Sequence, residues 1–171
     1  KVKLMQKNWI GKSFGCEIDF KILDKSEKIK VFTTRPDTIF GVSFMVLAPE
    51  HPYVKEITTQ NNMTAVKNYQ EKASKKSERD RQSDVKSISG VNTGAFAIHP
   101  LSGEKIEIWI ADYVLASYGT GAVMAVPCGD QRDYDFAKHF GIAIKNIFKD
   151  IQIEEGAHTE KTGTLKESDF L

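Results

Sequence analysis

Hydrophobic and polar residues alternate with a period of two along several short stretches of the chain, a pattern typical of half-buried β-strands. Residues 17–22 and 30–34 flank a polar turn at 24–28, so together they predict a β-hairpin. The same reasoning predicts further strands, at residues 42–48, 95–99 and 105–111. Residues 122–126 are too apolar for a solvent-facing strand and predict a buried one. Pro127 ends that strand because proline has no N–H to donate to a ladder.

Residues 53–58 and 63–78 predict helices. The second carries apolar residues at a spacing of three to four: Met63, Val66, Tyr69 and Ala73. A short helix is predicted at 134–140, so Asp130 and Asp133 lie near its N-terminus, where the helix dipole stabilises a carboxylate. Many short strands with two or three helices predict a β-rich domain, but the strand count alone does not distinguish a closed barrel from an open sheet.

Composition limits the number of domains and the class of protein. A chain of 171 residues suits one domain, and 40% hydrophobic with 27% charged residues is ordinary for a soluble globular protein. The net charge of +1 gives no global sign of nucleic-acid binding, and no apolar run is long enough to cross a membrane. Cys16 and Cys128 are far apart without a CxxC motif, so we expect two reduced thiols in a cytoplasmic protein, although the sequence leaves a disulfide open.

The stretch from Tyr118 to Asp133 reads YGTGAVMAVPCGDQRD. Its Gly-Thr-Gly turn permits backbone torsions that other residues disfavour, and the buried strand that follows ends in two carboxylates and a guanidinium. A rigid strand that delivers a charged cluster to its end is a common way to build a functional site. The cluster comprises Asp130, Arg132 and Asp133.

A second strand also ends in a polar cluster with a proline. Residues 31–41 read VFTTRPDTIFG, in which Thr33, Thr34 and Thr38 supply hydroxyls. Arg35 supplies a fork of donors that suits a phosphate or a carboxylate.

Together, TTRPDT at 33–38 and YGTGAVMAVP with DQRD at 118–133 resemble the editing domain inserted into bacterial-type leucyl-tRNA synthetases. The resemblance covers nearly the whole chain, including NWIGKS at 8–13 and the segment 163–168. The sister isoleucyl and valyl enzymes usually have Trp at the position of Asp37 and His at that of Met124, so both residues favour the leucyl branch.

The resemblance implies a β-rich α/β fold with a closed β-barrel core and peripheral helices. It implies a single editing domain over 1–171, with 1–15 and about 150–171 as linkers to the rest of a synthetase. The implied partner is the 3′ acceptor end of tRNA(Leu) carrying a noncognate amino acid. We expect a monomer without a cofactor or metal, since the four histidines lack ligand spacing.

The implied reaction is hydrolysis of the aminoacyl ester when tRNA(Leu) carries isoleucine, methionine or norvaline. A methylene group is worth only about 1–3 kcal/mol in binding, so a second site supplies the missing discrimination. Asp133 matches the aspartate that pairs with the substrate α-ammonium, with a helix-capping acid as the alternative. Thr38 matches the threonine that obstructs the leucine side chain, with a turn hydroxyl as the alternative.

The remaining positions match as follows. Asp130 is a second acid of the motif, for which a helix cap or an Arg132 partner is an equal alternative. Met124 and Val126 match pocket walls, with plain core positions as the alternative. The implied ester and ribose contacts come from Thr33 and Thr34, and Arg35 is implied to meet the phosphate or ribose unless it pairs with Asp37. The terminal adenine is implied to meet the backbone from Leu115 to Tyr118 and the Tyr118 ring.

One position departs from the family pattern. The family usually has His just before the DQRD run, and here that residue is Gly129. Catalysis would then depend on substrate hydroxyls, threonines and positioned water. This departure leaves an alternative function open: a module that binds the tRNA acceptor end and has little or no hydrolytic activity when it is detached from its synthetase.

The charged stretch from 72 to 86 has two interpretations. It carries six basic residues, Lys72, Lys75, Lys76, Arg79, Arg81 and Lys86, set against three acids. We favour a solvated helix end and loop over a peripheral patch that faces tRNA. Other chemistry has little support, because Gly119-Thr-Gly121 lacks the third glycine of a dinucleotide loop and Ser117 lacks a GxSxG elbow.

Overall fold

The computed structural model describes residues 14–83, 87–160 and 162–166. In these ranges six strands form one sheet with the order β2-β1-β4-β5-β3-β6. Their bounds are β1 Cys16–Ile22, β2 Lys28–Thr33, β3 Phe44–Leu47, β4 Val91–Ile98, β5 Lys105–Ile110 and β6 Ala122–Ala125. β3 and β5 run parallel, and the other neighbouring pairs are antiparallel.

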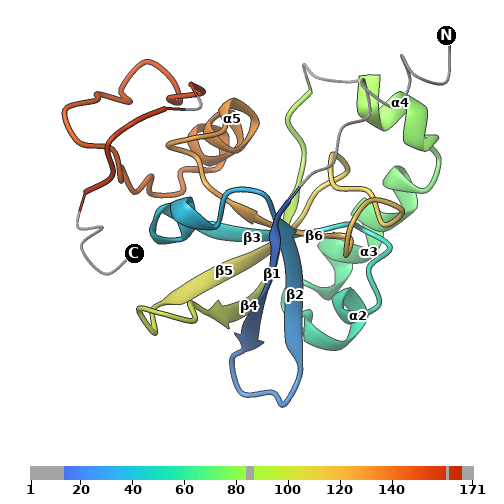
Figure 1. Cartoon of the computed structure of the whole chain (residues 1–171). Coiled ribbons are helices and arrows are strands. Elements are labelled where there is room, and N and C mark those ends of the chain that lie inside the picture. Colours follow the sequence, from blue (N-terminus) through green and yellow to red (C-terminus); the bar gives the residue numbers. More distant parts are fainter. Residues whose placement is uncertain (1–13, 84–86, 161, 167–171) are drawn as a thin grey trace, which may run out of the picture.

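The sheet curls until its two end strands approach each other. β2 and β6 stand at opposite ends of the strand order, yet they lie close together in space (Figure 1). The result is a nearly closed mixed barrel with helices around it, which confirms the fold class predicted from the sequence. Because the seam joins the end of β2 to β6, the two polar clusters of the sequence meet there.

Helices cover two sides of the barrel. On one side lie α2 (Tyr53–Ile57), α3 (Met63–Ala73) and α4 (Glu78–Ser83); on the other lie α5 (Gln131–Phe140) and the chain that follows it (Figure 1). A 3₁₀ helix, η1 (Pro36–Gly41), connects β2 to β3. No helix in the described ranges has the length and apolar character needed to cross a lipid bilayer.

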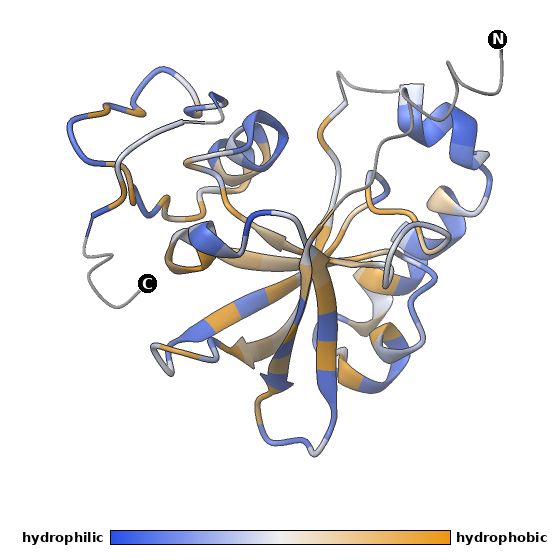
Figure 2. Cartoon of the chain, viewed as in Figure 1, coloured by the Kyte–Doolittle hydropathy of each residue, from blue (hydrophilic) through white to orange (hydrophobic). Residues whose placement is uncertain are grey.

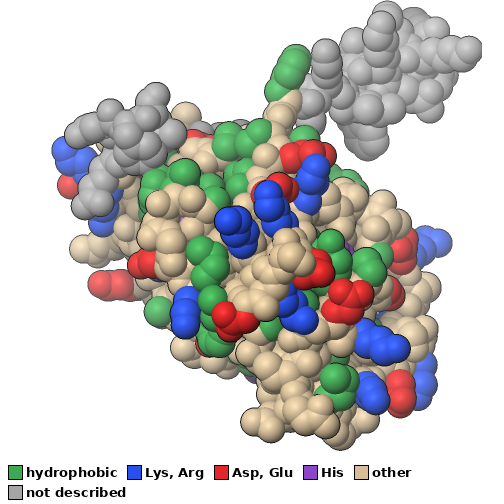
Figure 3. Space-filling model, turned by 90° about the horizontal axis from the view of Figure 1, so that it is seen from below, with side chains coloured by type: hydrophobic (Ala, Val, Ile, Leu, Met, Phe, Trp, Pro, Cys, Tyr) green, Lys and Arg blue, Asp and Glu red, His purple; other side chains and the backbone are tan. Residues whose placement is uncertain are grey.

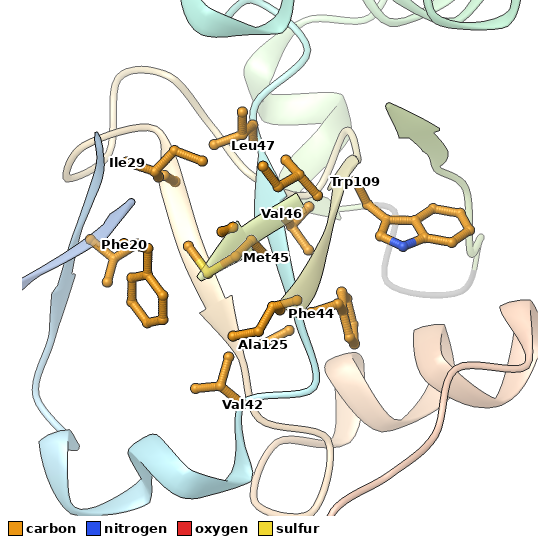
Figure 4. Packing of buried hydrophobic residues seen from close by; sticks show 14 of the residues in the cluster. Phe20, Ile29, Val42, Phe44, Met45, Val46, Leu47, Trp109 and Ala125 are labelled. Carbon is orange, nitrogen blue, oxygen red and sulfur yellow. The ribbon is translucent and has the colours of Figure 1, made fainter. Parts of the chain in front are cut away.

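The hydrophobic pattern accounts for the core. β2 alternates between exposed and buried residues, as its hydropathy shows in Figure 2, and buries Ile29 and Val31. All four residues of β3 are buried, because β3 lies between β5 and β6 inside the sheet. Side chains from β1, β2, β3, β5 and β6 pack together in Figure 4. Phe44 of β3 stacks on Phe136, with ring centroids 5.1 Å apart, and so fixes α5 against the sheet.

Three boundaries differ from the predictions by three residues or more. β4 begins at Val91 rather than 95, because a register shift between Asn92 and Phe96 interrupts its alternation. The predicted helix 63–78 ends at Ala73, and a separate helix, α4, follows. α5 begins at Gln131 rather than 134, because Asp130 caps it and brings the polar residues after it into the first turn.

The charged stretch 72–86 is only partly a solvated surface. Most of its described residues are exposed, but Arg81 is 3% exposed. Its Nε and Nη2 donate to the backbone oxygens of Asp112 and Val114, each at 2.7 Å, and its Nη1 pairs with Glu50. Arg81 is therefore a buried anchor for the segment between β5 and β6, which corrects the interpretation of a solvated helix end at this one residue.

Surface charge and cysteine state follow the sequence. Basic and acidic side chains are interspersed over the face shown in Figure 3, in keeping with a net charge of +1. Cys16 and Cys128 are free thiols, as predicted, and Cys128 is buried. Residues 1–13 lie outside the described residues, so the structure shows nothing of most of the first predicted linker.

Candidate functional site

The turn after β6 presents the later polar cluster. The backbone oxygen of Val126 accepts the N–H groups of Gly129 and Asp130, at 2.9 and 3.0 Å. The Asp130 side chain then caps α5: its Oδ1 accepts the N–H groups of Arg132 at 2.9 Å and of Asp133 at 3.1 Å. The helix cap considered for Asp130 is therefore present, and contact with a substrate stays a prediction.

Asp133 turns away from the helix end and toward β6. Its Oδ2 accepts the Val126 N–H at 2.9 Å, and its Oδ1 accepts the Tyr113 hydroxyl at 3.2 Å. The residue is 8% exposed. Burial, followed by the charge of Asp130, raises the pKa of Asp133 to about 7, against the lowering effect of these two hydrogen bonds and of Arg132. A buried carboxyl with a perturbed pKa, supported by fixed donors, is typical of a functional group.

The earlier polar cluster folds into η1. Thr33, the last residue of β2, accepts the Arg35 N–H on its Oγ1 at 3.0 Å. Pro36 occupies the first turn, where its fixed φ suits a helix. The Thr38 hydroxyl donates to the Arg35 backbone oxygen at 2.9 Å, and Thr38 is 6% exposed. Thr38 thus acts as a turn hydroxyl while it also lines a cavity described below.

Arg35 forms a bidentate ion pair with Asp37. Its Nε and Nη2 donate to the two carboxylate oxygens at 3.0 and 2.9 Å. These hydrogen bonds lower the pKa of the Asp37 carboxyl. The pairing that the sequence left open is present, and contact of Arg35 with phosphate or ribose stays a prediction.

Close packing brings η1 against the turn after β6. A Cβ at Gly41 would lie 2.9 Å from Val126 Cγ1 and 3.0 Å from Cys128 Sγ, so only glycine permits this approach. The contact places Thr38 and Asp133 at one cavity although they come from different ends of the chain.

This smaller cavity has a volume of about 190 Å³. Hydroxyls and charged groups line it together with apolar walls: Thr33, Arg35, Thr38, Met124, Val126, Gly129, Asp130, Asp133, Phe148 and His158. A cavity with a buried carboxylate at one side and apolar walls elsewhere suits a small ligand that carries a cation and an aliphatic group.

A larger cavity of about 550 Å³ adjoins the smaller one. Four residues line both: Thr33, Met124, Asp130 and Asp133. Thr34 and Tyr118 line the larger cavity, and Tyr118 is 83% exposed. Leu115 is buried and lines neither cavity, so its contact with a ligand stays a prediction. Gly119 and Gly121 have φ of 63° and 68°, which confirms the backbone torsions expected at this turn.

Comparison with known proteins decides the family. Residues 7–171 match the family model described as leucyl-tRNA synthetase, editing domain. The chain belongs to this family of editing domains. The match confirms the family indicated by the two motifs, and with it the enzyme class, the editing domain of a leucine–tRNA ligase.

Relatives of this editing domain are longer proteins. Leucine–tRNA ligase of Christiangramia forsetii is 58% identical over 171 residues, which cover 99% of this chain and 18% of the relative. Leucine–tRNA ligase of Elusimicrobium minutum is 54% identical over 168 residues, covering 98% of this chain and 20% of the relative. The chain therefore spans about a fifth of the length of the curated relatives it matches.

A solved structure shares the fold. It is the ternary complex of an Agrobacterium radiobacter K84 LeuRS with tRNA and LeuAMS. The TM-score is 0.73 at 36% identity, and the match covers 88% of this chain and 18% of that one.

The sequence did not identify Tyr113, Phe148 and His158 as residues that line the two cavities. Tyr113 lies between β5 and β6, and Phe148 and His158 lie in the segment after α5. That segment had no clear hydrophobic period, although Phe148 and Leu165 form a bridge within it and the backbone N–H of His158 joins it to the backbone oxygen of Cys128. The aromatic character of Tyr113 and its place just before the Gly-Thr-Gly turn are the signals that could have identified it.

Gly129 leaves its position in the editing domain without a side chain, and a histidine from elsewhere lies on the same cavity. The backbone N–H of His158 donates to the backbone oxygen of Cys128 at 2.9 Å. The Nε2 atom of the His158 ring forms a hydrogen bond with the backbone oxygen of Thr162, also at 2.9 Å. Among the described residues, no group of three or more His, Cys, Asp or Glu is placed to hold a metal ion.

Proposed function

We propose that this editing domain hydrolyses the aminoacyl ester of tRNA(Leu) that carries isoleucine, methionine or norvaline, and spares leucyl-tRNA(Leu). The observation that supports this most directly is the shared cavity of Asp133 and Thr38. One residue offers a buried carboxylate for an ammonium group, and the other narrows the space beside it. A free α-ammonium and a small side chain are what a mischarged aminoacyl ester presents.

The amino acid occupies the smaller cavity in this proposal. Its ammonium donates to Asp133, which has acceptor capacity left because each of its oxygens accepts one hydrogen bond from the protein. Its side chain lies against Met124 and Val126, and Thr38 obstructs the branched side chain of leucine. The Asp130 side chain caps the N-terminus of α5 and adds negative charge near the ammonium.

The ester lies where β2 approaches β6, and the terminal adenosine extends into the larger cavity. Hydroxyls of Thr33 and Thr34 bond the ester region and the ribose, and they stabilise negative charge that develops on the carbonyl oxygen. Arg35 faces the phosphate or ribose. The adenine stacks on the exposed Tyr118 ring and meets the backbone from Leu115 onward.

Hydrolysis then needs only a positioned water. Water attacks the ester carbonyl and releases one proton to solvent, and a tetrahedral oxyanion forms. Its collapse breaks the bond to the ribose oxygen, which takes the second proton of the water, so that the amino acid leaves as a carboxylate and the ribose keeps a hydroxyl. Proximity and oxyanion stabilisation supply the acceleration.

Deacylation of isoleucyl-tRNA(Leu) by this chain tests the proposal, with leucyl-tRNA(Leu) as the matched substrate. We expect faster loss of isoleucine than in buffer and no acceleration for leucine. If the chain binds the acceptor end without hydrolysis of either ester, it is a binding module instead. Equal acceleration of both esters would contradict the proposed discrimination.

A further inference from the structure

The Asp133 carboxylate is held by two donors from different parts of the chain. The backbone N–H of Val126 reaches Oδ2 at 2.9 Å, and the Tyr113 hydroxyl reaches Oδ1 at 3.2 Å. An ionised carboxylate has about four acceptor positions, so two stay available for a ligand. Because one donor sits on each oxygen, the plane and direction of the carboxylate are both determined.

Tyr113 is itself held in place. Its ring packs edge-to-face against Phe136 of α5 at 5.9 Å, and the Arg132 guanidinium lies 5.5 Å from its ring centroid. Burial, together with the neighbouring Asp133, raises the pKa of Tyr113 well above its usual value. The hydroxyl therefore keeps its proton at neutral pH, and it donates rather than accepts toward Asp133.

We propose that Tyr113 is a positioning residue, whose hydroxyl holds the Asp133 carboxylate toward the cavity and in the ionised form that binds an ammonium group. This inference rests on the proposed function only where it names the ammonium of an aminoacyl ester as the ligand. The hydrogen bond itself belongs to the free protein and can be tested there.

Charges around Asp133 make this donor important. Asp130, at the start of the same helix, disfavours a second negative charge, whereas Arg132 favours it. Two further groups that can carry positive charge line the same cavity. Arg35, directly before η1, is paired with Asp37, and His158 comes from the segment after α5. With burial opposing ionisation, the Tyr113 hydroxyl is one of two hydrogen-bond donors that favour the carboxylate form.

The test is Tyr113→Phe, which removes the hydroxyl and keeps the ring. Carboxyl ¹³C NMR of the ligand-free chain follows the titration of Asp133. We expect its midpoint to rise by about one pH unit, a tenfold change in the protonation equilibrium. Tyr134→Phe is the control, because the Tyr134 hydroxyl donates to the Glu154 backbone oxygen at 2.7 Å and not to Asp133. An unchanged Asp133 midpoint in Tyr113→Phe would overturn the proposal.

Kinetics provide the second readout. At pH 7 we expect Tyr113→Phe to raise KM for isoleucyl-tRNA(Leu) about fivefold with a smaller change in kcat, because the ionised fraction of Asp133 falls from about a half to about a tenth. We expect the defect to shrink above pH 8. A defect that is the same at every pH would contradict the proposal, since a purely structural role predicts that. If wild-type chain does not hydrolyse the ester, the proposed function fails, while the NMR midpoint still decides the role of Tyr113.

A reverse measurement applies if Tyr113→Phe does not fold. Tyrosine ¹³Cζ labelling of Asp133→Asn follows the Tyr113 phenol. We expect its titration to move to lower pH, because the neighbouring carboxylate raises the pKa of that phenol. No movement would show that the two groups are not coupled and would overturn the proposal.

Discussion

Thr38 and Asp133 line the same cavity, although Thr38 lies in η1 after β2 and Asp133 lies in α5 after β6. The curl of the sheet brings β2 and β6 together, and the close approach at Gly41 sets η1 against the turn that follows β6. The two residues therefore depend on barrel closure for their proximity. This relationship supports the proposal that one residue holds the ammonium while the other screens the side chain.

Removing the Asp133 charge is expected to abolish most of the activity. Loss of one partner from a buried charge pair costs about 2–5 kcal/mol. Asp133→Asn should therefore lower kcat/KM for isoleucyl-tRNA(Leu) by about 30-fold or more, measured by deacylation. Asp135→Asn is the control, because Asp135 is an exposed acid on the same helix that bonds to Gln131. Equal activity of both variants would remove Asp133 from the site.

Shortening Thr38 is expected to weaken discrimination. Thr38→Ala should make leucyl-tRNA(Leu) a substrate, with deacylation at least about tenfold faster than by the wild type, the order expected for one methyl-sized change. Thr58→Ala is the matched control: Thr58 is also buried and donates to a backbone oxygen, that of Val54, but outside the two cavities. If leucyl-tRNA(Leu) stays intact with Thr38→Ala, Thr38 does not screen leucine.

Asp133 is expected to make stability depend on pH. Its pKa rises from 3.8 to about 7 on folding, so the folded state binds the proton more tightly than the unfolded state does. The resulting stabilisation is fully present below about pH 4 and is lost as the pH rises through about 7.

Denaturant unfolding of wild type and Asp133→Asn at pH 4 and pH 8 measures this effect. The free energy of unfolding of the wild type should fall by roughly 2–4 kcal/mol more than that of Asp133→Asn, because other titrating groups cancel in the comparison. Parallel losses in the two proteins would show that the Asp133 carboxyl titrates normally.

Arg81 is expected to stabilise the segment that carries Tyr113. Arg81→Met would leave the backbone oxygens of Asp112 and Val114 without this donor. Two buried acceptors without partners predict a loss of about 2–4 kcal/mol in the free energy of unfolding. Arg79→Met, at an exposed position of the same helix, should change it by less than about 0.5 kcal/mol. Similar losses in both would contradict the anchoring role.

Short-range patterns predicted much of the fold. The β1–β2 hairpin and β5 could be identified because one face of each is buried, which imposes alternation. The start of β4 could not, because its ladder is shifted between Asn92 and Phe96. Arg81 was also missed, since a charge run gives no sign of the one residue that tertiary contacts bury.

The site was predictable where motifs carry it and not where packing does. Thr33, Thr38 and Asp133 belong to two recognisable motifs at strand ends. Phe148 and His158 reach the same cavity from an irregular segment, whose path depends on contacts with distant residues. Periodicity has no information about such a path.

The central claim is that Asp133 binds the amino acid's ammonium while Thr38 faces its side chain. A crystal structure with an amide-linked isoleucyl-adenosine, which cannot undergo ester hydrolysis, tests it most directly. We expect the ammonium nitrogen about 2.7–2.9 Å from an Asp133 oxygen, the side chain against Thr38, and the adenine beside Tyr118. An amino acid bound away from Asp133, with the cavity between Thr38 and Asp133 left unfilled, would contradict it.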